Sequence, residues 1–317
     1  MIETMEECEY LMMTGLMRLT RTELRAGCAD LLPFSRYALG STEQIIARTR
    51  TSCETDMAVV KNLLGLTNAL SVQIGTIWRD SMTLENALHK FCKHIFVLTG
   101  DEQFPYNFRG SGAAVKIAGR HFLFCCRHQI GDCRPDQIAI RLSHENRIMS
   151  ASTMRWPAIV RGDEDDDSVD FVVFEFFLEN YPAPNLTSEF FPLEEERIWP
   201  TGSVRLPFMI FGYPTERQLI DYEASRLQAR SLEVPGVYDG GTNSPHLHRV
   251  KMQRDKPFDA DGLSGGPIFY VGGSPGNYFA GFVGIAARGS ATSDYLHFIA
   301  AHHLIDIALD DRTSAKS

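Results

Sequence analysis

The sequence contains no run of about 18 apolar residues, the length that a membrane-spanning helix requires. Its first residues, MIETMEECEY, are acidic, whereas a secretory signal begins with basic residues. Basic residues are also in the minority, because 31 Lys and Arg stand against 40 Asp and Glu, for a formal charge of −9. A nucleic-acid-binding protein needs a basic face that displaces counterions. We therefore expect a cytoplasmic protein that binds neither a membrane nor nucleic acid.

Cysteine is absent after residue 133, and no two cysteines form a C-x-x-C pair. The seven cysteines are Cys8, Cys28, Cys53, Cys92, Cys125, Cys126 and Cys133. An odd number in a chain of 317 residues does not indicate a disulfide framework, because a chain of this length buries a core without one. We expect reduced and mostly buried thiols.

The pattern of apolar residues divides the chain near residue 93. Before that point apolar residues recur at helical spacing, as at Leu84, Leu88 and Phe91, and residues 1–93 are expected to form a helical extension. Residues 94–317 are expected to form a separate, β-rich domain. The chain closes with YLHFIAAHHLIDIAL, where an apolar stripe that begins at Leu296 and Ile299 predicts a helix.

Eight short apolar runs in the second part are separated by turns rich in Gly, Pro, Asn and Asp. They are residues 112–117, 121–126, 137–142, 171–177, 208–214, 248–252, 267–272 and 279–287. Because no helical pattern lies between them, the fold class predicted is mainly β, as an antiparallel barrel or sandwich.

The segment DGLSGGP places three glycines around Ser264, immediately before an apolar strand. Glycines let the backbone turn sharply, so that the amides of Gly262 and Ser264 are able to converge on one point. Two such donors stabilise the oxyanion that forms when a serine attacks a carbonyl. A glycine-rich turn that merely precedes a strand is the alternative interpretation.

Two further polar residues stand at the ends of apolar strands. The strand RHFLFCC is followed by His128, which by itself would also fit a capping or surface residue. Asp170 begins the strand DFVVFEF, where a carboxylate drawn into the core requires a hydrogen-bond donor such as an imidazole N–H. That bond would fix the tautomer and leave the other ring nitrogen free to accept the proton of Ser264.

The order His128, Asp170, Ser264, with G-x-S-G-G-P and D-F-V-V-F, resembles the trypsin-like (chymotrypsin-fold) serine peptidases, in particular their cytosolic bacterial type. The resemblance implies a double antiparallel β-barrel with a C-terminal helix over residues 94–317. It also implies a serine endopeptidase that cleaves proteins or peptides through an acyl-enzyme, without a metal or other cofactor. His128, Asp170 and Ser264 would be the catalytic residues, and the amides of Gly262 and Ser264 the oxyanion hole.

The same resemblance suggests residues of the substrate cleft. The stretch FVGIAARGS is similar to the strand that pairs with substrate in this family, which implies that Ala287, Arg288 and Gly289 line the cleft. The base of the specificity pocket falls at Phe258 and Asp259. Phe258 would favour an apolar or small side chain, whereas an inward Asp259 would favour Arg or Lys.

The chain departs from the family at two places. The residues CCRH, which end in His128, stand where the family usually has T-A-A-H. Leu263 stands where the digestive enzymes carry an Asp immediately before the catalytic serine. The first departure supports an alternative function, a catalytically silent barrel that acts as a binding or scaffold module. Residues 1–93 are either a packing extension or a module that docks a regulatory protein partner, as in proteases of bacterial conflict and anti-phage systems.

Histidines outside these motifs are not expected to bind a metal. His246 and His248 could place two rings on one strand face, but no carboxylate or cysteine at matching spacing joins them, which favours a surface loop. His302 and His303 are neighbours on the predicted closing helix and point in different directions. Cys125 and Cys126 are weak candidate nucleophiles, since their apolar neighbours raise the pKa of a thiol.

Overall fold

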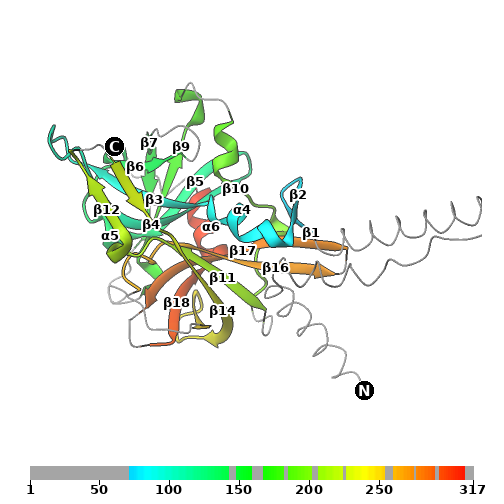
Figure 1. The fold of residues 1–317 in the computed structure, drawn as a ribbon. Coiled ribbons are helices and arrows are strands. Elements are labelled where there is room, and N and C mark those ends of the chain that lie inside the picture. The colour runs from blue at the N-terminus through cyan, green and yellow to red at the C-terminus, as the bar shows by residue number, and fades with distance from the viewer. Residues whose placement is uncertain are drawn as a thin grey trace, which may run out of the picture. The chain divides into compact units, whose positions relative to one another are not determined.

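The structure is a computed structural model. It describes residues 71–142, 148–158, 167–181, 185–201, 206–223, 226–253, 260–274, 276–289 and 293–310. All of these residues belong to one compact unit that spans 68–317 (Figure 1). The helical prediction for residues 1–70 and the pocket residues Phe258 and Asp259 lie outside the described residues.

Six antiparallel strands close into a barrel in the C-terminal part of this unit (Figure 1). In spatial order they are β16 (Pro267–Ser274), β11 (Pro207–Gly212), β14 (Leu232–Gly241), β15 (Leu247–Met252), β18 (Tyr295–Ala300) and β17 (Asn277–Gly289). The ring is closed because β16 pairs with β11 on one side and with β17 on the other. Its core is aromatic and aliphatic, with Phe208, Ile268 and Phe298 fully buried.

A second sheet forms an incomplete barrel. Its strands, in spatial order, are β7 (Ile148–Ser150), β6 (Ile138–Arg141), β3 (Cys92–Leu98), β4 (Tyr106–Ile117), β5 (Arg120–Cys126), β9 (Phe171–Phe176) and β8 (Thr153–Arg155), with β10 (Phe191–Pro192) beside β4. The two end strands are consecutive pieces of one segment. The amides of Ala151 and Ser152 between them bind the carbonyls of Ile138 and Glu175, so this segment spans from β6 to β9.

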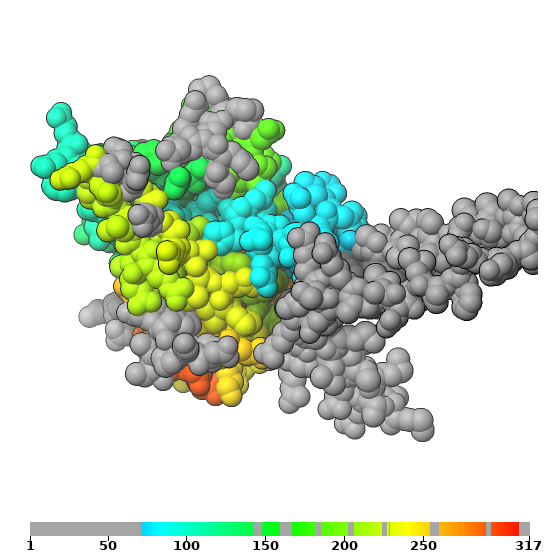
Figure 2. All heavy atoms as spheres, viewed as in Figure 1, coloured from blue at the N-terminus to red at the C-terminus, as the bar shows by residue number. Residues whose placement is uncertain are grey.

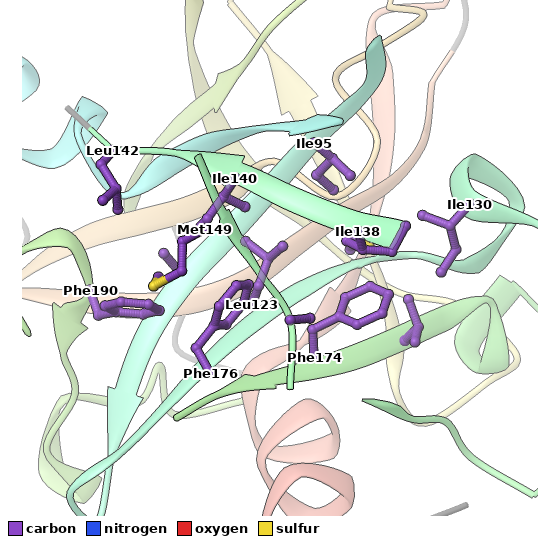
Figure 3. Close-up of a cluster of buried hydrophobic side chains, with 14 of the residues drawn as sticks. Ile95, Leu123, Ile130, Ile138, Ile140, Leu142, Met149, Phe174, Phe176 and Phe190 are labelled. Carbon is purple, nitrogen blue, oxygen red and sulfur yellow. The ribbon is translucent and has the colours of Figure 1, made fainter. Parts of the chain in front are cut away.

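The second sheet buries its own apolar cluster. Figure 3 shows the side chains of Leu123, Ile138, Phe174 and Phe176 pointing toward one another. All eight predicted apolar runs form strands, so the prediction of a mainly β fold is confirmed. The remaining short elements are η2 (Pro135–Gln137), η3 (Asp167–Val169), η4 (Leu178–Asn180), η5 (Leu186–Glu189), η6 (Glu195–Arg197), η7 (Thr215–Arg217), and the hairpin of β12 (Gln218–Asp221) and β13 (Arg226–Ala229).

The predicted closing helix is shorter than expected. Helix α6 covers only Ala301–Leu309, whereas Leu296 and Ile299 belong to strand β18. Both side chains are buried, and the backbone of β18 is paired on both edges, with β15 and with β17. Tertiary pairing therefore overrides a local pattern that also suits a helix.

The helical prediction is also wrong for residues 71–80. These residues form a hairpin of β1 (Ser71–Ile74) and β2 (Ile77–Asp80), and β1 runs parallel to β17. Gly75 has a φ of +58°, which suits the two-residue turn of the hairpin. The four residues of β2 are exposed, and the cyan spheres of this part of the chain lie on the visible face in Figure 2.

A short helix follows the hairpin. The Asp80 side chain accepts a hydrogen bond from the amide of Met82 and caps η1 (Ser81–Thr83), which continues into helix α4 (Leu84–His89). Leu84 and Leu88 are buried as predicted, but Cys92 already begins β3. Throughout the ranges that the structure describes, no helix combines the length and the apolar character needed to cross a bilayer.

Candidate active site

His128 and Asp170 are brought together by the register of two neighbouring strands. Strand β5 pairs antiparallel with β9, and Cys126 at the end of β5 lies opposite Phe171 at the start of β9. His128 lies in α5 (Arg127–Ile130), two residues beyond the end of β5, and Asp170 immediately precedes β9. The Arg127 amide donates to the Asp170 carbonyl at 3.1 Å, which joins the two segments at this end.

The Asp170 carboxylate binds His128 at two points. One oxygen, Oδ1, accepts the backbone N–H of His128 at 3.0 Å, and the other, Oδ2, accepts a hydrogen bond from Nδ1 of the ring. This contact raises the pKa of His128 above its ordinary value, while partial burial opposes the shift and Asp167 and Asp261 add to it. With Nδ1 bound to the carboxylate, Nε2 is the ring nitrogen left to accept a proton.

The imidazole is accessible. The side chain of His128 is 52% exposed, and beside it lies an open cavity of about 460 Å³. The cavity is lined by Arg109, Gln129, Ile130, Gly131, Asp132, Cys133 and Gln137, together with His128 itself. A substrate can therefore reach the ring without a rearrangement of the core.

Ser264 lies in a turn, residues 261–265, just before β16. Gly262 has a φ of +87° and Gly265 a φ of +77°, which is backbone geometry that other residues rarely adopt. A Cβ on Gly262 would lie 2.4 Å from the Tyr213 carbonyl oxygen, and one on Gly265 would lie 2.2 Å from the Ser111 carbonyl oxygen. Gly266 is equally confined, because its Cβ would lie 2.0 Å from a carbonyl oxygen of β11.

The peptide groups of this turn are held one by one. Four successive carbonyls accept hydrogen bonds: Asp261 from the Thr215 amide at 3.0 Å, Gly262 from Ser111 Oγ at 2.6 Å, Leu263 from the Gly266 amide at 2.8 Å, and Ser264 from Gln129 Nε2 at 2.7 Å. Because each carbonyl is fixed, the N–H on the other side of each peptide group is fixed as well.

Two of the amides in this turn have no partner. The amides of Leu263, Gly265 and Gly266 donate to the carbonyls of Ala260, Ala286 and Leu263, respectively. In the part of the chain that the structure describes, the amides of Gly262 and Ser264 donate to no acceptor. A pair of oriented, unused N–H groups next to a serine hydroxyl is the arrangement that stabilises an oxyanion.

The hydroxyl of Ser264 has its hydrogen-bond partner outside the His128 segment. Its Oγ donates to the carbonyl of Ala287 at 3.0 Å, and no hydrogen bond joins it to the His128 ring within the described residues. Ala287 lies at a bulge of β17, where the register with β18 shifts between Ala286 and Arg288. The family resemblance implies a cleft position for Ala287. The hydrogen bond between Ser264 and Ala287 is not predictable from the sequence.

Of the other predicted cleft residues, Arg288 is exposed, with 68% of its side chain accessible. Its Nη1 lies 3.0 Å from Oδ1 of Asp167, three residues before Asp170. Arg288 thus places a positive charge beside an acidic group that faces His128. Gly289 ends strand β17 next to it and is also exposed.

Cys126 lies at the centre of the site but is not activated. Its sulfur and the ligand atoms of His128 and Asp170 lie within 4.8 Å of one another, a set that could hold a metal ion. However, burial raises the pKa of this thiol far above its ordinary value, and Sγ donates to the Ala286 carbonyl at 3.3 Å. Burial therefore disfavours the thiolate that nucleophilic attack or metal binding requires. Cys92, Cys125 and Cys133 are also free thiols.

The prediction of a surface loop for His246 and His248 is wrong for His248. This residue lies in β15 and is 4% exposed, packed against Trp199 and Phe298 of the closed barrel. The ring of His246 stacks on that of His303 from α6 at 3.9 Å. Burial lowers the pKa of His303 to about 4. These parallel rings are a packing arrangement, since coordinating nitrogens must converge on one point.

Sequence reasoning misses Ser111 and Gln129, the two side chains that hold the turn from the other sheet. Ser111 is completely buried, and its Oγ also accepts the Tyr213 amide at 2.8 Å. Gln129 directly follows His128 in α5. In the sequence, Ser111 lies between two glycines and Gln129 follows His128. Neither position has a sequence spacing that would predict contact with residues 262–264.

No protein-family model matches the chain, and no curated protein matches it. Among solved structures, the chain is similar to the crystal structure of a thermostable serine protease from an extremophilic microorganism. The two are 14% identical, the match covers 69% of this chain and 95% of that one, and the TM-score is 0.44.

Proposed function

We propose that this protein is a serine endopeptidase of the trypsin-like type, with Ser264 as nucleophile, His128 as general base and Asp170 as the residue that orients the base. The observation that carries the proposal is the two-point hydrogen bonding between His128 and Asp170. It fixes the imidazole tautomer beside a serine whose own amide and that of Gly262 are unused.

The reaction follows from these positions. Ser264 Oγ leaves the Ala287 carbonyl, transfers its proton to Nε2 of His128 and attacks the carbonyl carbon of a peptide bond. Asp170 stabilises the imidazolium, and the amides of Gly262 and Ser264 bind the oxyanion. His128 then protonates the leaving amine, and the acyl group remains on Ser264. Water, deprotonated by His128, releases the acid and restores the serine. These steps need no metal or organic cofactor.

The substrate is proposed to be a protein or peptide that lies along the Ala287–Gly289 end of β17. The exposed guanidinium of Arg288 would contact it there, next to Asp167. Whether Phe258 or Asp259 selects the side chain before the scissile bond stays a prediction of the sequence, as does cytoplasmic localisation. Control by a partner that docks on residues 1–93, in a bacterial defence setting, is likewise a proposal from the sequence pattern.

A second candidate function is a catalytically silent module that binds proteins. One observation favours it: the Ser264 hydroxyl donates to the Ala287 carbonyl and is not hydrogen-bonded to His128. In a silent module this bond would be permanent. In an enzyme the Ser264 hydroxyl would exchange this bond for one to His128 when substrate or an acylating reagent binds. Catalytic hydrogen bonds commonly tighten only in the enzyme–substrate complex.

A fluorophosphonate probe, which reacts with activated serines, distinguishes the two functions. We expect one probe per chain in the wild type and none in Ser264→Ala, with both proteins equally folded by circular dichroism. Ser188→Ala is the matched control, because Ser188 is an exposed serine of η5 remote in sequence from the turn. A folded wild type that is not labelled, or labelling that persists in Ser264→Ala, would refute the proposal; the first result supports the silent module.

A further inference from the structure

The side chain of Gln129 connects the segment that carries His128 with the turn that carries Ser264. This side chain is nearly buried, at 8% exposure, although the residue lies in a one-turn helix next to the exposed His128. Oε1 accepts the Cys126 amide at 3.0 Å, and Nε2 donates to the carbonyl of Ser264 at 2.7 Å, 135 positions further along the chain. The same side chain is thus bonded to the segment of the base and to the nucleophile.

The orientation of the Gln129 amide is fixed by chemistry. Its oxygen faces a backbone N–H and its nitrogen faces a carbonyl, so a flipped amide would place donor against donor and acceptor against acceptor. The space around it is also shaped for this side chain. A Cβ on Gly110 would lie 2.1 Å from Nε2, and a Cβ on Gly265 would lie 2.8 Å from Oε1. Two glycines therefore form the slot that Gln129 fills.

The bond to Ser264 holds the backbone that carries the proposed nucleophile. It holds the carbonyl of the peptide group between Ser264 and Gly265, while the N–H of that group donates to Ala286 of β17 at 2.7 Å. With both ends of this peptide group held, the backbone after Ser264 is fixed between Gln129 and β17. Removal of the Gln129 bond leaves a partly buried carbonyl without this donor and releases one end of the peptide group.

We propose that Gln129 is a positioning residue, which ties the carbonyl of Ser264 to the helical turn of His128 and so fixes the distance between nucleophile and base. This inference rests on the proposed function for its catalytic part. Its structural part, that Gln129 holds the peptide group after Ser264, is independent of any activity.

The test compares Gln129→Met with Gln137→Met. Methionine keeps the length of glutamine and loses its hydrogen bonds. Gln137 is a close local match, because its Oε1 accepts the Arg134 amide at 3.0 Å, also three residues earlier, and it lines the same cavity. Neither the Gln137 side chain nor its bond reaches the turn of Ser264 in the described residues.

Two readouts are measured on each full-length variant. The first is hydrogen exchange at the Gly265 amide, followed by NMR. We expect faster exchange in Gln129→Met and unchanged exchange in Gln137→Met. The second is the rate of acylation by the fluorophosphonate probe, with kcat and KM for a peptide substrate. We expect the rate and kcat to fall about 10- to 100-fold in Gln129→Met, with KM and the pH midpoint unchanged, because misplacement of the nucleophile affects the chemical step.

Each outcome decides the inference. Unchanged Gly265 exchange in Gln129→Met overturns it, whether or not the protein is an enzyme. Faster exchange with an unchanged acylation rate overturns the catalytic part. If the folded wild type does not react with the probe, the proposed function fails, and exchange alone decides the role of Gln129. Should Gln129→Met not fold, Gln129→Asn serves instead, since its amide is one methylene too short to keep both bonds.

Discussion

Ser111 offers a direct test of how the Ser264 turn is held. Its hydroxyl is completely buried, donates to the Gly262 carbonyl at 2.6 Å and accepts the Tyr213 amide at 2.8 Å. Ser111→Ala leaves a buried acceptor and a buried donor unpaired, and each unpaired group costs about 1–3 kcal/mol. We therefore expect the free energy of unfolding to fall by about 2–6 kcal/mol.

The measurement is thermal and urea unfolding, followed by circular dichroism, with Ser152→Ala as the matched control. Ser152 Oγ accepts only the amide of Phe177, at 3.0 Å and in an exposed position where water can replace it. We expect Ser111→Ala to lower the melting temperature by at least roughly 4 °C, and Ser152→Ala to lower it much less. Equal losses in the two variants would refute the reasoning that the buried hydroxyl holds the turn.

Two further predictions concern the base and the thiol. Because Asp170 raises the pKa of His128, the wild-type rate should rise with pH as the ring loses its proton above its ordinary range. Asp170→Asn removes the charge, so the midpoint of kcat/KM against pH should move to lower pH while the maximum falls about 10⁴-fold; an unmoved midpoint contradicts the role of Asp170. Cys126→Ala should keep most of the probe labelling, because burial keeps this thiol protonated. Loss of labelling in Cys126→Ala together with labelling of Ser264→Ala would assign the nucleophile to the thiol.

The sequence predicts most of the strands because their apolar runs are short and bounded by turn residues. The sequence does not predict β14, because Pro235 and several glycines are typical of a loop. In the structure this segment pairs with β11 and β15. The sequence also fails to predict β18, whose apolar residues fit a strand and a helix equally well until the neighbouring strands are known. Local patterns thus identify apolar segments, and pairing partners decide what they become.

In the candidate site as well, local features are predictable from the sequence and tertiary contacts are not. The positions of His128 and Asp170 at strand ends are visible in the sequence, and the register of β5 with β9 brings them into contact. The interactions that hold Ser264 are not visible, because Ser111 and Gln129 lie more than a hundred residues before the groups they bind. No spacing rule connects such residues, since the link exists only after both sheets have formed.

The crowding around the three glycines of the Ser264 turn changes how variation in this segment should be interpreted. Gly262, Gly265 and Gly266 are required by carbonyl oxygens of other segments that lie 2.0–2.4 Å from any added Cβ. Selection for stability alone would therefore preserve them, even in a descendant that had abandoned catalysis. On the proposed function, Ser264 is preserved for a different reason, the reactivity of its hydroxyl, which donates to the Ala287 carbonyl in this structure. On the same proposal, intact glycines with a substituted serine in homologous chains would identify copies that keep the fold of the turn and lack the reaction.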